Sequence, residues 1–254
     1  MTHSFAIQTH LHSALPNTAD EILLKQVPLE GPQALIWQGS QGLVVPRSYS
    51  RNPLFHTACQ HMAQAGWPVS LRQSGGGLVP QGPGIWNLSL AWRQYGKALD
   101  LAQEAYPFIC RLLQKTLMHC GIKSAPLAVE GSFCDGRFNL AIAQPHYQKI
   151  VGTAQVWRLS PAPAAQRQVL RQPGAAAGWH VGLIHAVILL QVNEKALTLQ
   201  TNLFEQLLQT QVRYESDKIC SLHKLNLDPK TFLNSLQFQL RQSTPPHDAI
   251  YSSP

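Results

Sequence analysis

The chain has 254 residues and a net charge of +7, and 44% of its residues are hydrophobic whereas only 13% are charged. This apolar content is too high, and this net charge too low, for a charge-driven disordered protein. No stretch approaches the roughly 18 apolar residues of a membrane-spanning helix, so we expect no membrane insertion. The first residues hold no basic segment followed by an apolar run, so we expect no secretory signal.

Lys and Arg together number 20, against 13 Asp and Glu, without long basic runs. This excess fits an acidic partner (nucleic acid, an anionic lipid or an acidic protein), or a mildly basic enzyme. The cysteines number five, which is odd and argues against a disulfide framework. A reducing, cytoplasmic location is therefore expected. His10 and His12 lack a second pair of ligands nearby, so no metal site is predicted.

Hydrophobic periodicity predicts helices and strands that are interspersed along the chain. In chain order, the first half is expected to hold a helix at 19–27, a hairpin of strands at 34–38 and 42–46, a helix at 53–65, strands at 69–72 and 85–92, and a helix at 98–120 interrupted near Pro107. The second half is expected to hold strands at 126–130, 138–143 and 149–158, a loop at 160–178, a strand at 180–192, and helices at 201–210 and 229–241. This pattern predicts one α+β domain over 1–242, with a central mixed sheet and a mobile tail at 243–254.

The segment from Leu71 to Ser89 is the most distinctive local feature, because Gly75, Gly76 and Gly77 follow a short strand directly. Without side chains, the backbone N–H groups there can approach a ligand closely. Arg72 lies just before them, where its guanidinium is placed to bind a phosphate or carboxylate. The spacing matches neither a Walker loop nor a dinucleotide-binding turn. A ligand-binding loop and an ordinary turn both remain open from composition.

Cys134 and Lys149 are the residues on which catalysis would depend. Cys134 lies between glycines and beside Asp135 in a predicted loop, where a thiolate can be exposed and stabilised by cations. The alternative is a small buried hydrophobic residue. Lys149 opens an apolar strand and points either into a site or to the surface. The other cysteines lie in apolar or helical patterns and are interpreted as core.

Four segments in the expected order resemble one family, the lipoate-protein ligases and octanoyltransferases, to which biotin-protein ligases are related. Arg72 to Ser89 resembles the family's R-R-x-S-G-G-G-x-V-x-x-x-x-G-x-x-N-x-S pattern. Lys149 to Gln155 is similar to K-[IL]-[SAV]-G-[ST]-A-Q, and Leu183 to Leu190 to L-H-H-G-T-[IL]-L-L. Lys218 to Leu222 is similar to K-[IV]-T-S-L. The resemblance covers about residues 20–225.

The resemblance implies a biotin/lipoate protein ligase-like fold, with a largely antiparallel sheet flanked by helices. It implies an acyl chain in a tunnel near the glycine loop, with Lys149 at the acyl carbonyl. The substrate-binding residues that it implies are Arg72, Ser74, Gly75, Gly76, Gly77, Asn87, Gly152, Thr153, Ala154 and His185. The acceptor would be a lysine on an acidic carrier, either the lipoyl domain of a 2-oxoacid dehydrogenase E2 subunit or the glycine-cleavage H protein. The protein would act as a monomer.

The loop around Cys134 favours one branch of the family. Gly131 to Gly136 resembles G-S-[FY]-C-P-G of the octanoyl amidotransferases, with Asp135 in place of the proline. In that subgroup the cysteine carries an acyl thioester, so octanoyl or lipoyl transfer requires no cofactor. The family's Y-H-D stretch is Pro80-Gln81-Gly82 here, and its H-H-G-T is Ile184-His-Ala-Val187, which weakens the ligase interpretation.

Two alternatives remain. One is an ATP-dependent lipoate-protein ligase, which would need ATP and Mg²⁺ and would make lipoyl-AMP. The other is a non-catalytic protein that binds an acyl-adenylate or nucleic acid. No helix-turn-helix precedes the core, and no RNA-recognition pattern occurs, so no nucleic-acid partner is expected.

Overall fold

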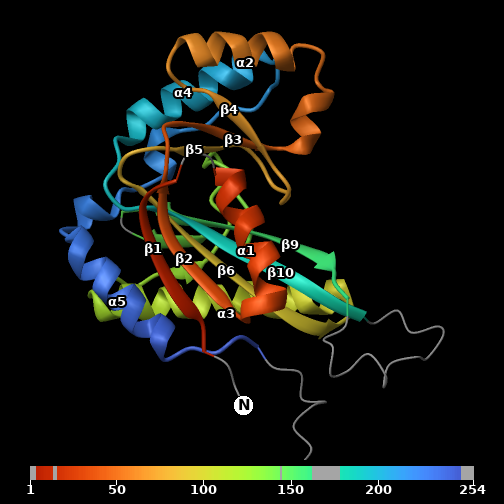
Figure 1. Cartoon of the computed structure of the whole chain (residues 1–254). Coiled ribbons are helices and arrows are strands. Elements are labelled where there is room, and N and C mark those ends of the chain that lie inside the picture. The colour runs from red at the N-terminus through yellow and green to blue at the C-terminus, as the bar shows by residue number, and fades with distance from the viewer. Residues whose placement is uncertain (1–3, 14–15, 144, 162–177, 247–254) are drawn as a thin grey trace, which may run out of the picture.

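The computed structural model describes residues 4–13, 16–143, 145–161 and 178–246. Within these residues the strands form a larger sheet and a smaller one (Figure 1). The larger sheet has the order β1 (Ala6–Ser13), β2 (Gln33–Gly39), β6 (Ile85–Gly96), β10 (Gly178–Leu189), β9 (Tyr147–Leu159), β8 (Leu140–Ala143) and β7 (Ala125–Pro126). The smaller sheet has the order β4 (Val69–Arg72), β3 (Gly42–Pro46) and β5 (Val79–Gln81).

Helices cover these sheets from outside. They are α1 (Pro16–Glu30), α2 (Phe55–Gln64), α3 (Ala98–His119), α4 (Glu194–Leu207) and α5 (Pro229–Arg241). In the larger sheet only β1 and β2 pair in parallel, and the other described pairs are antiparallel. The predicted α+β class, with a largely antiparallel mixed sheet flanked by helices, is therefore confirmed.

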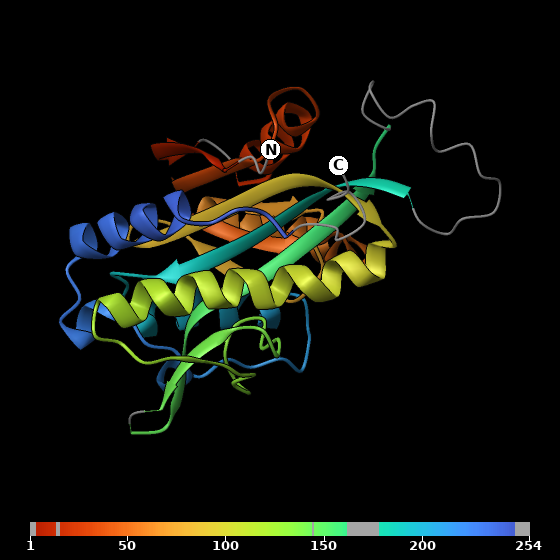
Figure 2. The ribbon, with the colours of Figure 1, turned by 90° about the horizontal axis from the view of Figure 1, so that it is seen from below.

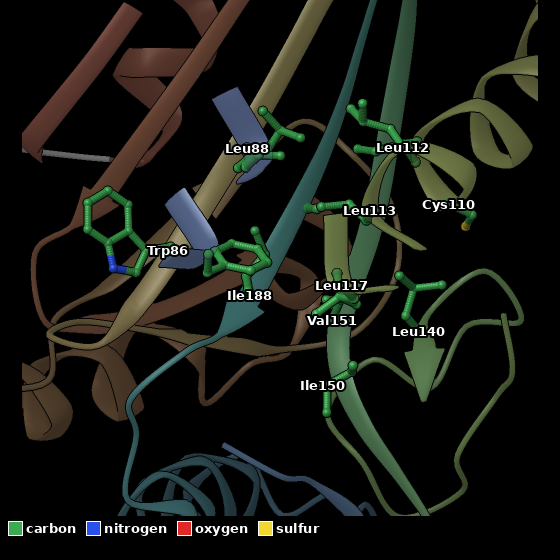
Figure 3. Close-up of a cluster of buried hydrophobic side chains, with 14 of the residues drawn as sticks. Trp86, Leu88, Cys110, Leu112, Leu113, Leu117, Leu140, Ile150, Val151 and Ile188 are labelled. Atoms are coloured by element: carbon green, nitrogen blue, oxygen red, sulfur yellow. The ribbon is translucent and has the colours of Figure 1, made fainter. Parts of the chain in front are cut away.

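One face of the larger sheet packs against α3, with α5 alongside (Figure 2). Apolar residues of α3 recur at helical spacing, so Ile109, Leu113 and Leu117 all face the sheet and are fully buried. They meet Leu88 of β6 and Ile188 of β10 in the main core (Figure 3). Burying each such side chain stabilises the fold by roughly 1.5–3 kcal/mol, so this layer fixes the sheet rigidly.

The opposite face of the same strands carries the side chains that build the site. His185 of β10 lies directly opposite Ser89 of β6 and Ala154 of β9, so these three side chains share one face of the sheet. Helix α1 contacts β6 and β10, and its Asp20 accepts a hydrogen bond from Ser89, so α1 covers this face. The smaller sheet, backed by α2 and α4, lies next to it (Figure 1).

Most predicted elements are confirmed, but the hairpin expected at 34–38 and 42–46 is wrong. Both segments are strands, yet β2 belongs to the larger sheet and β3 to the smaller one. Strand β2 already has β1 on one side and β6 on the other, so no edge is left for β3. Sequence periodicity predicts a strand but not its partner.

Further corrections concern single elements. Helix α3 continues through Pro107 without the expected interruption. The strand expected at 126–130 is reduced to β7, whereas β1 was not predicted at all. Most of the predicted loop at 160–178 and most of the tail at 243–254 lie outside the described residues.

Candidate active site

Cys134 lies in the loop that joins β7 to β8, and its backbone adopts a left-handed conformation with φ of 47°. This conformation costs roughly 1–2 kcal/mol for a residue with a side chain, so its neighbours must hold it in place. Three donors converge on the Cys134 carbonyl oxygen. They are the Gly136 N–H at 2.8 Å, the Asn139 side-chain amide at 2.6 Å and the Lys149 Nζ at 3.1 Å.

Lys149 of β9 is buried beneath this loop. Its Nζ donates to the carbonyl oxygens of Phe133 and Cys134. The ammonium group therefore holds the peptide groups before and after Cys134. Burial lowers the pKa of Lys149 to about 8, and negative charge on Cys134 and Asp135 opposes this shift. At neutral pH the side chain is therefore mostly a cation beneath the cysteine.

The glycine loop covers Cys134 from the opposite side. The Gly77 N–H donates to the Cys134 Sγ at 3.1 Å, a contact that stabilises a thiolate. Gly76 has φ of +102°, and a Cβ there would lie 2.6 Å from the Sγ atom. The run of glycines therefore places a backbone donor against the sulfur where any side chain would clash.

Arg72 holds the glycine loop in this position. Its guanidinium donates to the carbonyl oxygens of Val44 at 3.0 Å, Gly75 at 2.9 Å and Gly77 at 2.6 Å. The side chain is buried, and burial lowers its pKa while negative charge on Cys134 opposes the shift. In this structure the guanidinium therefore holds the glycine loop and places a positive charge near Cys134, and its role in binding an anion stays a prediction.

These residues enclose one small cavity. Its lining consists of Arg72, Val79, Cys134, Lys149, Gly152, Thr153, Ala154, His185 and Val187. The volume is only about 10 Å³, room for about one water. A second hollow shares Arg72 with the first and is lined by Asp20, Ser74, Val156 and Leu183. The predicted residues Arg72, Gly152, Thr153, Ala154 and His185 are therefore brought together around Cys134 and Lys149, whereas Ser74 lines the second hollow.

Asn87 and Gly75 are exceptions among the predicted substrate-binding residues. The Asn87 amide exchanges two hydrogen bonds of 2.9 Å with Gln81, and Asn87 does not line the cavity. Gln81 lies in the segment that replaces the family's Y-H-D stretch, so that segment braces the sheet here. Gly75 presents open space at its Cβ position and offers its carbonyl to Arg72.

Two contributing residues were not predicted from the sequence. Asn139 donates to Cys134 and accepts the Thr153 N–H at 3.0 Å, so it ties the cysteine loop to β9. Asp20 lies 3.5 Å from the Nδ1 atom of His185. Asn139 follows the cysteine segment closely and was within reach of sequence inspection, whereas Asp20 lies far upstream and gives no local signal.

A buried polar cluster supports the loop from below. Tyr49 and Tyr214 both donate to the Glu205 carboxylate, at 2.7 and 3.0 Å, and Thr210 donates to its other oxygen. Burial raises the pKa of both tyrosines, which therefore remain donors. The Tyr214 ring packs edge-on against Phe133, the residue before Cys134. The cluster thus fixes the position of the peptide that Lys149 contacts.

All five cysteines are free thiols. Burial raises the pKa of Cys59, Cys110, Cys120 and Cys220, which opposes thiolate formation. Within the described residues, no group of three or more His, Cys, Asp or Glu side chains is placed to hold a metal ion. In the same part of the chain, no helix is long and apolar enough to cross a membrane.

The sequence profile of the lipoyl protein ligase A/B catalytic domain matches residues 14–160. This match covers more than half of the chain and includes the glycine loop, Cys134 and Lys149. The chain belongs to this family. It is thus an enzyme of the lipoate ligase and octanoyltransferase family, as its motifs predicted.

Two relatives illustrate where this lipoyl protein ligase A/B family member stands. An uncharacterized protein of Cupriavidus necator is 39% identical over 207 residues, which are 81% of this chain and 79% of that protein. The octanoyl-GcvH:protein N-octanoyltransferase of Kyrpidia tusciae is 31% identical over 140 residues, or 55% of this chain. The latter match spans about half of that relative, 47% of its length.

Solved structures of the family share the fold. Lipoate-protein ligase A bound with ATP superposes with a TM-score of 0.67 at 13% identity, covering 97% of this chain and 89% of that one. A bipartite lipoate protein ligase from Thermoplasma acidophilum, analysed with its E2 lipoyl domain, gives a TM-score of 0.57 at 14% identity. That match covers 97% of this chain and 87% of the archaeal chain.

Proposed function

We propose that the protein transfers an octanoyl or lipoyl group from a donor carrier to a lysine of a lipoyl carrier domain, through a thioester on Cys134. The observation that carries this proposal is the convergence of charge and donors on one cysteine. The Cys134 Sγ accepts the Gly77 N–H, and the Lys149 ammonium lies directly beneath the same residue. Both features favour the thiolate, which is the reactive form.

In the first step, the Cys134 thiolate attacks the acyl carbonyl carbon of the donor thioester. The new C–S bond forms, the bond to the donor sulfur breaks, and the donor thiolate leaves and takes a proton from solvent. The transient oxyanion needs hydrogen-bond donors, which the glycine-loop backbone and the Lys149 ammonium would supply after the acyl group enters. In the second step, the acceptor lysine amine replaces Cys134 at the same carbon.

The energetics of this exchange remove the need for a nucleotide. A thioester is converted to an amide, which is downhill, and Cys134 holds the acyl group between the two steps. An ATP-dependent ligase is the alternative, because lipoate-protein ligase A has the same fold and binds ATP. In that mechanism an acyl-adenylate is the activated species, and no cysteine is required.

The partners proposed are acidic carrier domains. Octanoyl-GcvH transferases are among the relatives, and one structural neighbour was analysed with an E2 lipoyl domain. A net charge of +7 favours encounter with such acidic domains. The proposed acceptors are therefore the lipoyl domains of 2-oxoacid dehydrogenases and the glycine-cleavage H protein, and the donor is a carrier that bears the acyl group as a thioester.

A transfer assay with two substrate sets tests this proposal. One set contains a carrier protein that bears octanoyl as a thioester and an apo lipoyl domain without nucleotide, and the other contains free octanoate, ATP, Mg²⁺ and the same lipoyl domain. We expect mass spectrometry to find the octanoylated lipoyl domain in the first set only. Modification in the second set alone, with release of pyrophosphate, would replace the transferase proposal with the ligase.

A further inference from the structure

His185 is the titratable side chain of the cavity that the mechanism above does not use. It comes from the middle of β10, lines the cavity with Cys134 and Lys149, and is buried to all but 7% of its surface. A histidine is able to accept a proton near neutral pH. The second transfer step needs such a group, because an amine that attacks a thioester must lose a proton.

The other charged groups around the cavity are not free to accept that proton. The Lys149 Nζ already donates to two carbonyl oxygens, and its cation is needed beneath Cys134. Arg72 has no lone pair to accept with. Asp135 is exposed and does not line the cavity, and Glu21 is paired with Arg158. Among the lining residues, His185 is therefore the suitable acceptor.

A chain of polar contacts orients His185 from behind. The Nδ1 atom lies 3.5 Å from the Asp20 Oδ2, an ion-pair distance that becomes a hydrogen bond with a small movement. The other Asp20 oxygen accepts from Ser89 Oγ at 3.0 Å, and Ser89 in turn accepts from Trp37 Nε1 at 3.1 Å. With Asp20 fixed in this way, a proton on Nδ1 is directed to Asp20, and Nε2 is left to act as base.

We propose that His185, oriented by Asp20, is the general base of the second step of the proposed transfer; the inference rests on that proposed function. The lone pair of the acceptor lysine amine forms the N–C bond to the acyl carbon. The proton released from that nitrogen passes to His185 Nε2, and the electrons of the C–S bond return to Sγ. His185 then gives the proton to solvent, so atoms and charge balance. Asp20 is a positioning residue.

Separating the two half-reactions tests this assignment. The acyl-enzyme is formed with a carrier protein that bears octanoyl as a thioester, isolated, and mixed with an apo lipoyl domain, and transfer is followed in a single turnover by intact mass. His185→Gln retains a polar side chain of similar reach but removes the base. General-base catalysis contributes typically about 10²–10⁴-fold, so we expect acylation at nearly the wild-type rate and acyl transfer slowed about 10²-fold. Asp20→Asn should slow the same step by about tenfold.

His180→Gln is the matched control. His180 lies on the same strand, is 6% exposed against 7% for His185, and its Nδ1 donates to the Gly178 carbonyl oxygen away from the cavity. It should leave both half-reactions unchanged. Equal slowing of both half-reactions in His185→Gln, or wild-type transfer in His185→Gln, would overturn the assignment.

Two measurements keep the result interpretable. If His185→Gln does not fold, Asp20→Asn replaces it, and wild-type transfer from Asp20→Asn would likewise overturn the assignment. If the wild-type protein forms no acyl-enzyme at all, the proposed thioester mechanism itself fails and the role of His185 fails with it. A wild-type acyl-enzyme whose transfer is insensitive to His185 removes only the role of His185.

Discussion

The Nζ atom of Lys149 lies 3.1 Å from the carbonyl oxygen of Cys134, so the cation and the candidate nucleophile are joined through the cysteine backbone. The ammonium donates to backbone carbonyl oxygens, whereas the sulfur is held by the Gly77 N–H. Lys149 therefore has two tasks in this arrangement. It stabilises the left-handed backbone of Cys134, and it supplies positive charge close to the thiolate.

The buried Lys149 should make protein stability depend on pH. Because burial lowers its pKa from 10.5 to about 8, the unfolded chain binds more protons than the folded one between these values. Between pH 8 and pH 10.5 the free energy of unfolding should therefore rise by about 3 kcal/mol. The Lys149→Met variant should not show this rise. Urea unfolding at pH 7, 9 and 10.5 measures it. Parallel pH curves for both proteins would contradict the assignment.

Gly152 should be essential because of its distance from Lys149. A Cβ at this position would lie 2.9 Å from Nζ and push the ammonium away from the cysteine loop. We expect Gly152→Ala to fold and to lose about 10²–10³-fold in transfer rate, the typical effect of losing one charge-stabilising donor. Gly136→Ala is the control, since its Cβ meets open space. Equal rates for the two variants in the transfer assay would refute this role of Gly152.

The glycine loop offers a second matched pair. Gly76→Ala would place a Cβ 2.6 Å from the Cys134 Sγ and force a side chain into a φ of +102°, whereas Gly75→Ala meets nothing within 4 Å. We expect Gly76→Ala to lose the contact between the Gly77 N–H and the sulfur and to lose acyl transfer, because the loop must move away from the sulfur. Gly75→Ala should retain both. Full activity in Gly76→Ala would mean that the loop does not cover Cys134.

Replacing Asn139 should slow acyl transfer by more than the loss of protein stability explains. Removing its amide takes the acceptor from the partly buried Thr153 N–H and takes one of three donors from the Cys134 carbonyl. Asn139→Ala should cost about 1–3 kcal/mol of unfolding free energy and slow transfer at least tenfold. Asn193→Ala, which removes the N-cap of α4, should cost about 1 kcal/mol without slowing transfer. A transfer rate in Asn139→Ala equal to that of Asn193→Ala would show that Asn139 acts only on stability.

The sequence predicts which segments form helices and strands better than it predicts which strands pair. It also predicts the central residues of the site better than the residues that hold them in place. Helical spacing of apolar residues correctly predicted α3, because that pattern records a buried face. The pairing of β3 with β4 and β5 rests on long-range contacts that no local pattern records. Motif order indicated Cys134, Lys149 and the glycine loop. It did not indicate Asp20, which reaches His185 only because α1 packs across β10.

Arg72 shows the same limit for a single residue. Its place before three glycines predicted that it is placed to bind an anion, which stays a prediction; the sequence did not predict that the guanidinium donates to two loop carbonyls, those of Gly75 and Gly77. Charge type can be read from the sequence, whereas the direction in which a side chain points depends on the packed fold. Arg72 stays a predicted contact of the acyl substrate only through its place in the cavity lining.

The thioester on Cys134 is tested most directly by intact mass after incubation with a carrier protein that bears octanoyl as a thioester, in the absence of nucleotide. The account predicts one octanoyl adduct that is removed by neutral hydroxylamine, absent from Cys134→Ser and retained in Cys59→Ser, whose thiol lies in α2. An unmodified wild-type protein that still octanoylates the lipoyl domain, or an adduct that persists in Cys134→Ser, would contradict it.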